Sequence, residues 1–135
     1  MTPTILIIED CKDLAWILAR FLRDAGYRVL VAYDGAHGLA LVERERPDCV
    51  VLDLMMPVMS GIEVLQRLRH GPATATLPVV LVSARVGQGR THMLAEGDAD
   101  YCVAKPFTRA QVLYAVSMAL GRHVPEAMRA AGAAV

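Results

Sequence analysis

The stretch Cys49-Val50-Val51-Leu52-Asp53 is apolar at four consecutive positions and ends in a carboxylate. A strand that is apolar at every position, rather than at alternate positions, is typically buried on both faces. Four further runs of this kind occur along the chain, at residues 5–8, 29–32, 78–82 and 101–104. The pattern predicts a parallel five-stranded sheet that is covered by helices.

The segments between these runs have the three- and four-residue apolar spacing of amphipathic helices. Residues that cap helix N-termini precede several of them, and Gly or Pro follows. We expect helices over 14–25, after Asp34, after Ser60, over 88–96 and after Thr108. Five strand–helix units in about 120 residues imply right-handed crossovers and a doubly wound (βα)5 three-layer α/β sandwich.

Two of these helices carry sharper expectations. The helix after Ser60 should turn Ile62, Leu65 and Leu68 towards the sheet, because these residues recur at helical spacing. Thr108 and Gln111 are three residues apart before an apolar run, which is the pattern of a capping box. The sequence therefore predicts both the inner face of one helix and the start of another.

The composition limits the classes of function. The chain has 135 residues, of which 55% are hydrophobic, so it is long enough and apolar enough for one folded domain. Its 14 Lys and Arg residues balance 14 Asp and Glu residues. A net charge of zero argues against direct nucleic-acid binding and against a polybasic membrane anchor. We expect a domain over residues 1–120 and an Ala-rich tail over 121–135, either helical or loose.

Features of the ends and of the cysteines point to a cytoplasmic protein. No apolar run approaches the roughly 20 residues that span a bilayer. The first residues lack the basic segment of a signal peptide. Three cysteines, Cys11, Cys49 and Cys102, form an odd number without a CxxC pair, so neither a disulfide framework nor a zinc site is indicated. We expect a reducing compartment.

Polar residues follow the predicted strands. In open parallel sheets, the active site lies at the carboxyl ends of the strands. Glu9 and Asp10 follow the first apolar run, Asp53 ends the third, Ser83 ends the fourth and Lys105 follows the fifth. Three carboxylates, one hydroxyl and one ammonium group should therefore gather at one edge of the sheet.

Such a cluster needs a counter-charge. Two carboxylates about 4 Å apart repel by about 4 kcal/mol at an effective dielectric constant of 20. Oxygen ligands without His or Cys suit a hard cation, Mg²⁺ or alternatively Mn²⁺. A divalent ion, Lys105 and the hydroxyl of Ser83 together could hold phosphoryl oxygens. One carboxylate could then act as the nucleophile and form an aspartyl phosphate.

With these residues in view, the chain resembles a response-regulator receiver domain of two-component signalling, of the chemotaxis-regulator kind. The resemblance covers roughly residues 4–120. Asp53 lies 30 residues before Ser83 and 52 before Lys105, close to the usual spacing of that family. The resemblance rests on four stretches of sequence. They are Ile5-Leu6-Ile7-Ile8-Glu9-Asp10, Val50-Val51-Leu52-Asp53-Leu54-Met55-Met56-Pro57-Val58-Met59-Ser60-Gly61, Leu81-Val82-Ser83-Ala84 and Lys105-Pro106-Phe107. It implies a flavodoxin-like strand order, 2-1-3-4-5.

The resemblance also implies a role for each matching residue. Asp53 would be the phosphoacceptor and a metal ligand, together with Asp10 as a direct ligand and Glu9 as a ligand through water. The remaining implied roles are the backbone carbonyl of Met55 as a metal ligand, Ser83 and Lys105 as contacts of the phosphoryl group, Ala84 as the small residue that leaves it room, Gly61 as the turn glycine, and a cis bond between Lys105 and Pro106.

The sequence departs from the family pattern at the aromatic switch position. This residue usually lies three positions before the lysine, where the chain has Cys102, while Tyr101 lies one position earlier. A one-residue slip turns a strand side chain to the opposite face. Either Tyr101 or Cys102 could be the switch residue, or neither. Met55 and Arg85 occupy the positions that flank the access of water to the acyl phosphate.

The function implied by the resemblance is that of a phosphorylation-controlled switch. A histidine kinase or phosphotransfer protein would phosphorylate Asp53 in the presence of Mg²⁺, without turnover of external substrates. The change would alter the surface formed by the helix over 88–96, the strand over 101–104 and the helix after Thr108. That surface would bind an unknown downstream protein or output domain, or a second copy in a homodimer.

Two other functions remain open at this point. One is an aspartyl-phosphate phosphatase, although such enzymes commonly carry a second acid two residues after the nucleophile, where this chain has Met55. The other is a receiver-like interaction module that works without phosphorylation. Such a module would be expected to have lost an acid or the lysine, and the chain retains all of them.

Overall fold

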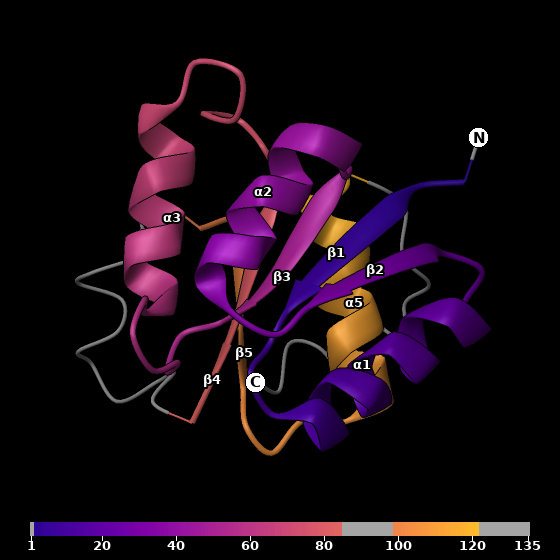
Figure 1. Ribbon diagram of the computed structural model, residues 1–135. Coiled ribbons are helices and arrows are strands. Elements are labelled where there is room, and N and C mark those ends of the chain that lie inside the picture. Colours follow the sequence, from indigo (N-terminus) through magenta and orange to yellow (C-terminus); the bar gives the residue numbers. More distant parts are fainter. Residues whose placement is uncertain (1, 85–98, 122–135) are drawn as a thin grey trace.

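The computed structural model describes residues 2–84 and 99–121. Within these ranges it contains a five-stranded, fully parallel sheet in the order β2-β1-β3-β4-β5 (Figure 1). The elements are β1 Thr4–Ile8, α1 Lys12–Asp24, β2 Arg28–Ala32, α2 Gly35–Glu45, β3 Cys49–Asp53, α3 Gly61–His70, β4 Val79–Ser83, β5 Tyr101–Ala104 and α5 Arg109–Ala119. The predicted strand order and the α/β sandwich are confirmed. The predicted helix over 88–96, Arg85 and the tail beyond Gly121 lie outside the described residues.

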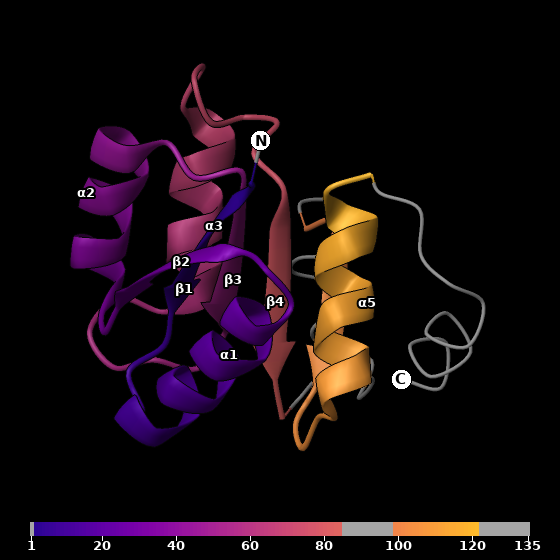
Figure 2. The ribbon, with the colours of Figure 1, turned by 90° about the vertical axis from the view of Figure 1, so that its right-hand side faces the viewer.

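The helices form two layers around the sheet. Figure 2 shows α2 and α3 on one face and α1 and α5 on the other. Each face has its own hydrophobic core, because the side chains of a strand alternate between the two sides. Ile5 and Ile7 of β1 pack towards α1 and α5. Leu6 and Ile8 pack towards α2 and α3.

The strands differ in burial according to their place in the sheet. The three central strands, β1, β3 and β4, are buried at nearly every position. The two edge strands, β2 and β5, are only partly buried, and Arg28 of β2 is exposed. The expectation that every run would be buried on both faces was therefore wrong for the edges. An edge strand has a neighbouring strand on one side only, so its open edge leaves its residues more accessible to solvent.

The helix ends largely follow the predictions. The Asp34 side chain accepts a hydrogen bond from the backbone N–H of His37 at 2.7 Å, which caps α2. Ser60 caps α3 in the same manner, through the N–H of Glu63. Thr108 and Gln111 form the predicted capping box of α5. Side-chain caps of this kind satisfy backbone donors that the helix cannot pair internally.

The inner face of α3 differs from its prediction. Val64, Leu65 and Leu68 are buried, whereas Ile62 is only partly buried beside the same core. The spacing of Gly61, Val64, Leu65 and Leu68 gives one continuous helical stripe, and Ile62 lies at its margin. The buried face of α3 is therefore rotated from the predicted one, towards Val64 and away from Ile62. In the described part of the chain, each helix is too short or too polar to cross a bilayer.

Candidate functional site

The carboxylates from β1 and β3 meet at one edge of the sheet. β1 and β3 are neighbours, with Ile8 opposite Leu52, so the residues that follow them leave the sheet side by side. One oxygen each from Glu9, Asp10 and Asp53 lies within 4.8 Å of the others. Glu9 and Asp53 are buried, with 1% and 3% of their surface exposed, and Asp10 is exposed. The expected convergence of three acids is therefore present.

Lys105 supplies a positive charge to this cluster. Its Nζ lies 3.2 Å from Asp53 Oδ1 and 3.3 Å from Glu9 Oε1. Its backbone N–H donates to the Ser83 carbonyl oxygen at 3.1 Å, and the Lys105–Pro106 peptide bond is cis. Burial lowers the pKa of the ammonium group, but the attraction of Glu9 and Asp53 outweighs this effect and raises it. Lys105 is therefore held as a cation against both buried acids.

Backbone donors hold the two buried carboxylates in place. The N–H of Met55 donates to Asp53 Oδ1 at 3.2 Å, and the N–H of Cys11 donates to Glu9 Oε2 at 3.1 Å. Both donors lie two residues beyond the acid that they contact, in the loop that leaves each strand. Each loop therefore holds one oxygen of its carboxylate through a backbone N–H group, and so fixes the orientation of the acid.

Glu9 has an unusual protonation equilibrium. The pKa of its carboxyl is raised to about 7, chiefly by burial and also by the negative charge of Asp53. The Cys11 N–H and the Lys105 ammonium act in the opposite direction and are outweighed. Without a metal ion, Glu9 is thus close to half protonated at neutral pH.

This pKa makes a prediction about stability without metal. In EDTA, the contribution of Glu9 to the free energy of unfolding is fully present below its unfolded pKa, near 4.5. It is lost as the pH rises through about 7, because the fold favours the protonated form. The loss between about pH 5 and 8 should be roughly 2–3 kcal/mol. Urea denaturation at a series of pH values measures it.

Glu9→Gln is the informative variant, since glutamine stays neutral throughout this range. Its unfolding free energy should lack the part of the pH dependence that Glu9 contributes in the parent protein. Glu43→Gln, which removes an exposed carboxyl, should retain the parental pH dependence. Identical pH profiles in the parent and in Glu9→Gln would contradict the prediction.

The cluster fits a hard divalent cation. Magnesium prefers oxygen ligands, carboxylates among them. The three carboxylate oxygens lie within 4.8 Å of one another, close enough for one ion to be shared between them. The donors are all carboxylate oxygens, and two of the three groups, Glu9 and Asp53, are buried. Glu9, Asp10 and Asp53 would hold such an ion, with Lys105 as the remaining neighbouring charge.

The other residues predicted at the site lie around this centre. Ser83 is fully buried at the end of β4, next to the strand that ends in Asp53. Ala84 is exposed and follows it. The Met55 side chain is 55% exposed, while its backbone is held against Asp53. An exposed apolar side chain at Met55 covers little of the site itself.

The structure places Tyr101 and Cys102 on opposite faces of β5. Tyr101 packs with the core on the α1 and α5 side, and its ring meets that of Tyr114 edge to face at 5.6 Å. Cys102 packs with the core on the α2 and α3 side. Cys102 lies opposite Leu81, two residues before Ser83, and so shares the face of Ser83. The position three before Lys105 therefore holds a cysteine on that face.

Val58 is the unexpected residue of the loop after Asp53. It has a φ of 67° and its side chain is fully exposed. The N–H of Met59 donates to the Pro57 carbonyl across it at 2.8 Å, which makes a γ-turn. A β-branched residue is strained in this region of φ. The Pro-Val pair in the sequence offered only a weak sign of such a turn.

Val58→Gly should therefore raise the free energy of unfolding by several tenths to about 1 kcal/mol. The relief of strain, about 1–2 kcal/mol, exceeds the entropy cost of glycine, about 0.5–1 kcal/mol. Val58→Ala is the matched control, because it shortens the side chain but keeps Cβ. It should leave stability nearly unchanged in urea denaturation. An equal gain from Ala would show that the exposed side chain, and not φ, carries the cost.

Comparison with known proteins identifies this arrangement. The family model described as "Response regulator receiver domain" matches residues 5–117. The chain belongs to the response regulator receiver domain family. Among curated relatives, transcriptional regulatory protein PrrA of Mycobacterium tuberculosis is 38% identical over 122 residues, which are 90% of this chain and 51% of PrrA. This receiver is also 35% identical to the phosphate regulon regulator PhoB of Rhizobium meliloti, over 95% of this chain and 56% of PhoB.

The receiver thus spans about half the length of these relatives. Among solved structures, it is similar to the receiver domain of the sensor histidine kinase PA1611 from Pseudomonas aeruginosa. The TM-score is 0.81 at 26% identity, covering 90% of this chain and 99% of that one. That structure is described as having a magnesium ion coordinated in its active-site cleft. This receiver has a cluster of three acids at the carboxyl edge of its sheet, Glu9, Asp10 and Asp53.

Proposed function

We propose that this receiver accepts a phosphoryl group on Asp53 from a histidine kinase or a phosphotransfer protein. The observation that carries the proposal is the position of Lys105 Nζ, 3.2 Å from Asp53 Oδ1, inside a buried cluster of three acids. Glu9 and Asp53 are the two acids in the described residues that are both buried and paired with Lys105. Of these, Asp53 is the one that stands at the phosphoacceptor position of the family pattern.

In the proposed step, an oxygen of the Asp53 carboxylate attacks the phosphorus of a phosphohistidine. A new P–O bond forms, the P–N bond breaks, and the leaving imidazole nitrogen takes the electron pair. Mg²⁺ bound by Glu9, Asp10 and Asp53 would neutralise charge on the transferred phosphoryl group. Lys105 stands close enough to Asp53 to contact a phosphoryl oxygen, and Ser83 ends the neighbouring strand. The backbone carbonyl of Met55 is a further proposed ligand.

The proposed output is a change in the surface on the β5 side of the molecule. Tyr101 on β5 contacts Tyr114 on α5, so a movement of β5 would be passed to α5. The helix predicted over 88–96, outside the described residues, would complete this surface. A downstream protein, an output domain or a second receiver would bind there. We assign the receiver to residues 1–120, with 121–135 as a tail, and expect it to act in the cytoplasm.

We propose that the receiver is a switch and not an enzyme with external substrates. Met55 stands two residues after Asp53, where an acid could have protonated a leaving group. Its side chain is exposed and apolar, and its backbone N–H is the part that contacts Asp53. Loss of the phosphoryl group would then occur by attack of water on the receiver's own acyl phosphate.

The test is the intact mass of the protein after incubation with acetyl phosphate. With Mg²⁺, the mass should increase by one phosphoryl group in samples taken early enough to catch a short-lived acyl phosphate. With EDTA, the increase should be absent, because the buried acids repel the anionic donor unless a cation balances them. No adduct at any time with Mg²⁺ would overturn the proposal in favour of an interaction module that works without phosphorylation.

A further inference from the structure

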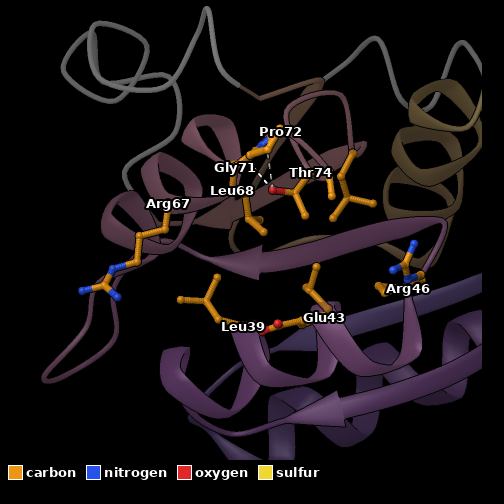
Figure 3. A pocket seen from close by; sticks show the side chains of 12 residues that line it. Leu39, Glu43, Arg46, Arg67, Leu68, Gly71, Pro72 and Thr74 are labelled. Atoms are coloured by element: carbon orange, nitrogen blue, oxygen red, sulfur yellow. Dashed lines mark hydrogen bonds between the residues drawn. The ribbon is translucent and has the colours of Figure 1, made fainter.

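A concave surface lies on the α2 and α3 side of the sheet. The elements that line it carry none of the three clustered acids, Glu9, Asp10 and Asp53. It is a groove of about 410 Å³ between α2, the end of α3 and the loop that follows α3. This volume is within the range of sites that bind small molecules, about 300–1,000 Å³. Figure 3 shows Leu39 and Glu43 on one side and Leu68 and Thr74 on the other. The groove exists because the loop over 71–77 brings mostly small side chains to α2.

The interior of this groove favours an apolar ligand body. Leu39, Val42, Leu68 and Leu77 line it. The polar groups of the loop are already paired: the Thr74 hydroxyl donates to the Leu68 carbonyl oxygen. The guanidinium group of Arg69 donates to the carbonyl oxygens of Thr74, at 3.3 Å, and Leu77, at 2.7 Å. A ligand in the groove therefore need not satisfy these loop carbonyls.

The rim of the groove carries charges that favour one negative group. Arg46 and Arg67 line it at opposite ends, with Glu43 on the α2 side (Figure 3). Arg67 is paired with Glu63 at 3.1 Å. Arg46 has no ion-pair partner within residues 2–84 and 99–121. The guanidinium of Arg46 is thus the available donor, and its planar fork matches a carboxylate.

The direction of Arg46 is set by the backbone. Arg46 ends α2 in the left-handed conformation, with φ of 49°, and its N–H donates to the Val42 carbonyl oxygen at 3.0 Å. Arg44, two residues earlier, is instead within 3.6 Å of Glu45 and does not line the groove. Arg46 therefore lines the groove, and Arg44, at the same end of α2 but outside the groove, can serve as a control for it. Glu43 disfavours ligands with several negative charges, such as phosphates.

We propose that this groove binds a small amphipathic carboxylate, with the apolar body between α2 and the 71–77 loop and the carboxylate on Arg46. The proposal is independent of phosphorylation at Asp53. The probe is 2-naphthoate, and 2-naphthamide serves as the neutral compound of the same shape. Binding is followed by ¹⁵N–¹H spectra of the full chain, which report the affected residues as well as the affinity.

Naphthoate should shift the amide signals of Leu39, Gly71, Ala73 and Thr74 saturably, and naphthamide should bind about tenfold more weakly, since a charge-assisted hydrogen bond is lost. Arg46→Gln should weaken naphthoate about tenfold and leave naphthamide unchanged. Arg44→Gln removes the same charge outside the groove and should leave both compounds unchanged.

A second pair of variants tests the apolar part of the groove. Ala73→Phe places a ring in the groove from an exposed loop position and should abolish binding of both compounds. Ala75→Phe, on the same loop but outside the lining, should leave binding intact. Three results would overturn the proposal: no saturable shifts at millimolar probe, equal effects of Arg44→Gln and Arg46→Gln, or shifts centred on residues that do not line the groove.

Discussion

Asp53→Asn should abolish phosphorylation by acetyl phosphate and Mg²⁺, with no adduct in intact-protein mass at any time of incubation. The amide oxygen of asparagine can still accept hydrogen bonds from Lys105 and from the Met55 N–H, so the site should keep its geometry. What the variant lacks is the negatively charged oxygen that would attack phosphorus. The expected effect is therefore complete loss of the reaction.

Asp10→Asn separates the acceptor from the proposed metal ligand. Asp10 is exposed at the mouth of the cluster, and its loss should weaken metal binding but leave Asp53 intact. The phosphoryl adduct of Asp10→Asn should recover as the Mg²⁺ concentration is raised, whereas Asp53→Asn should form no adduct at any Mg²⁺ concentration. An adduct that persists in Asp53→Asn would show that another group, such as Glu9 or Asp10, accepts phosphate.

A stability measurement tests whether the Asp53→Asn variant is folded. In EDTA, the thermal midpoint of Asp53→Asn should equal or exceed that of the parent, because Asp53 and Glu9 are buried together and repel each other. A lower midpoint would mean that the ion pair with Lys105 outweighs this repulsion. The incubation with acetyl phosphate would then be repeated at a temperature below the unfolding transition of the variant.

Gly61→Ala should destabilise the receiver by about 3 kcal/mol or more and should also impair phosphorylation. A Cβ at Gly61 would lie 2.7 Å from Leu54 Cα and 2.9 Å from the Asp53 carbonyl carbon, and closer still to the Asp53 carbonyl oxygen. These are backbone atoms, which cannot move aside as a flexible side chain can. Overpacking usually costs about 1–3 kcal/mol, and a backbone clash belongs at the upper end of that range. Urea denaturation measures the loss.

The clash also reaches the site itself. The Gly61 N–H donates to the Leu54 carbonyl oxygen at 2.9 Å, which holds the start of α3 against the residue after Asp53. Moving α3 away would shift the loop whose Met55 N–H contacts Asp53. Gly71→Ala, at the other end of α3, is the control: its Cβ would meet chiefly the Thr74 hydroxyl, at 2.7 Å. It should cost less than about 1 kcal/mol, and equal losses from the two variants would contradict the argument.

The succession of strands and helices along the chain, and the expectation of an acidic cluster at the edge of the sheet, followed from the sequence alone. Continuous apolar runs, helical spacing and cap residues act over a few neighbours, so they can be read without knowing the fold. The capping box at Thr108 and the cap at Asp34 were correctly predicted for this reason. The rule that parallel strands place functional residues at their carboxyl ends then linked Glu9, Asp53 and Lys105.

Features that depend on contacts between distant segments became visible in the folded structure alone. The pKa of Glu9 follows from burial beside Asp53, 44 residues away, together with Lys105. Whether Tyr101 or Cys102 faces the core shared with Ser83 depends on the register of β5 against β4. Ile62 packs against the core but is less buried than predicted, because the rotation of α3 is set by the sheet beneath it. Register, rotation and burial are properties of packing between elements, and short-range patterns in a sequence do not encode them.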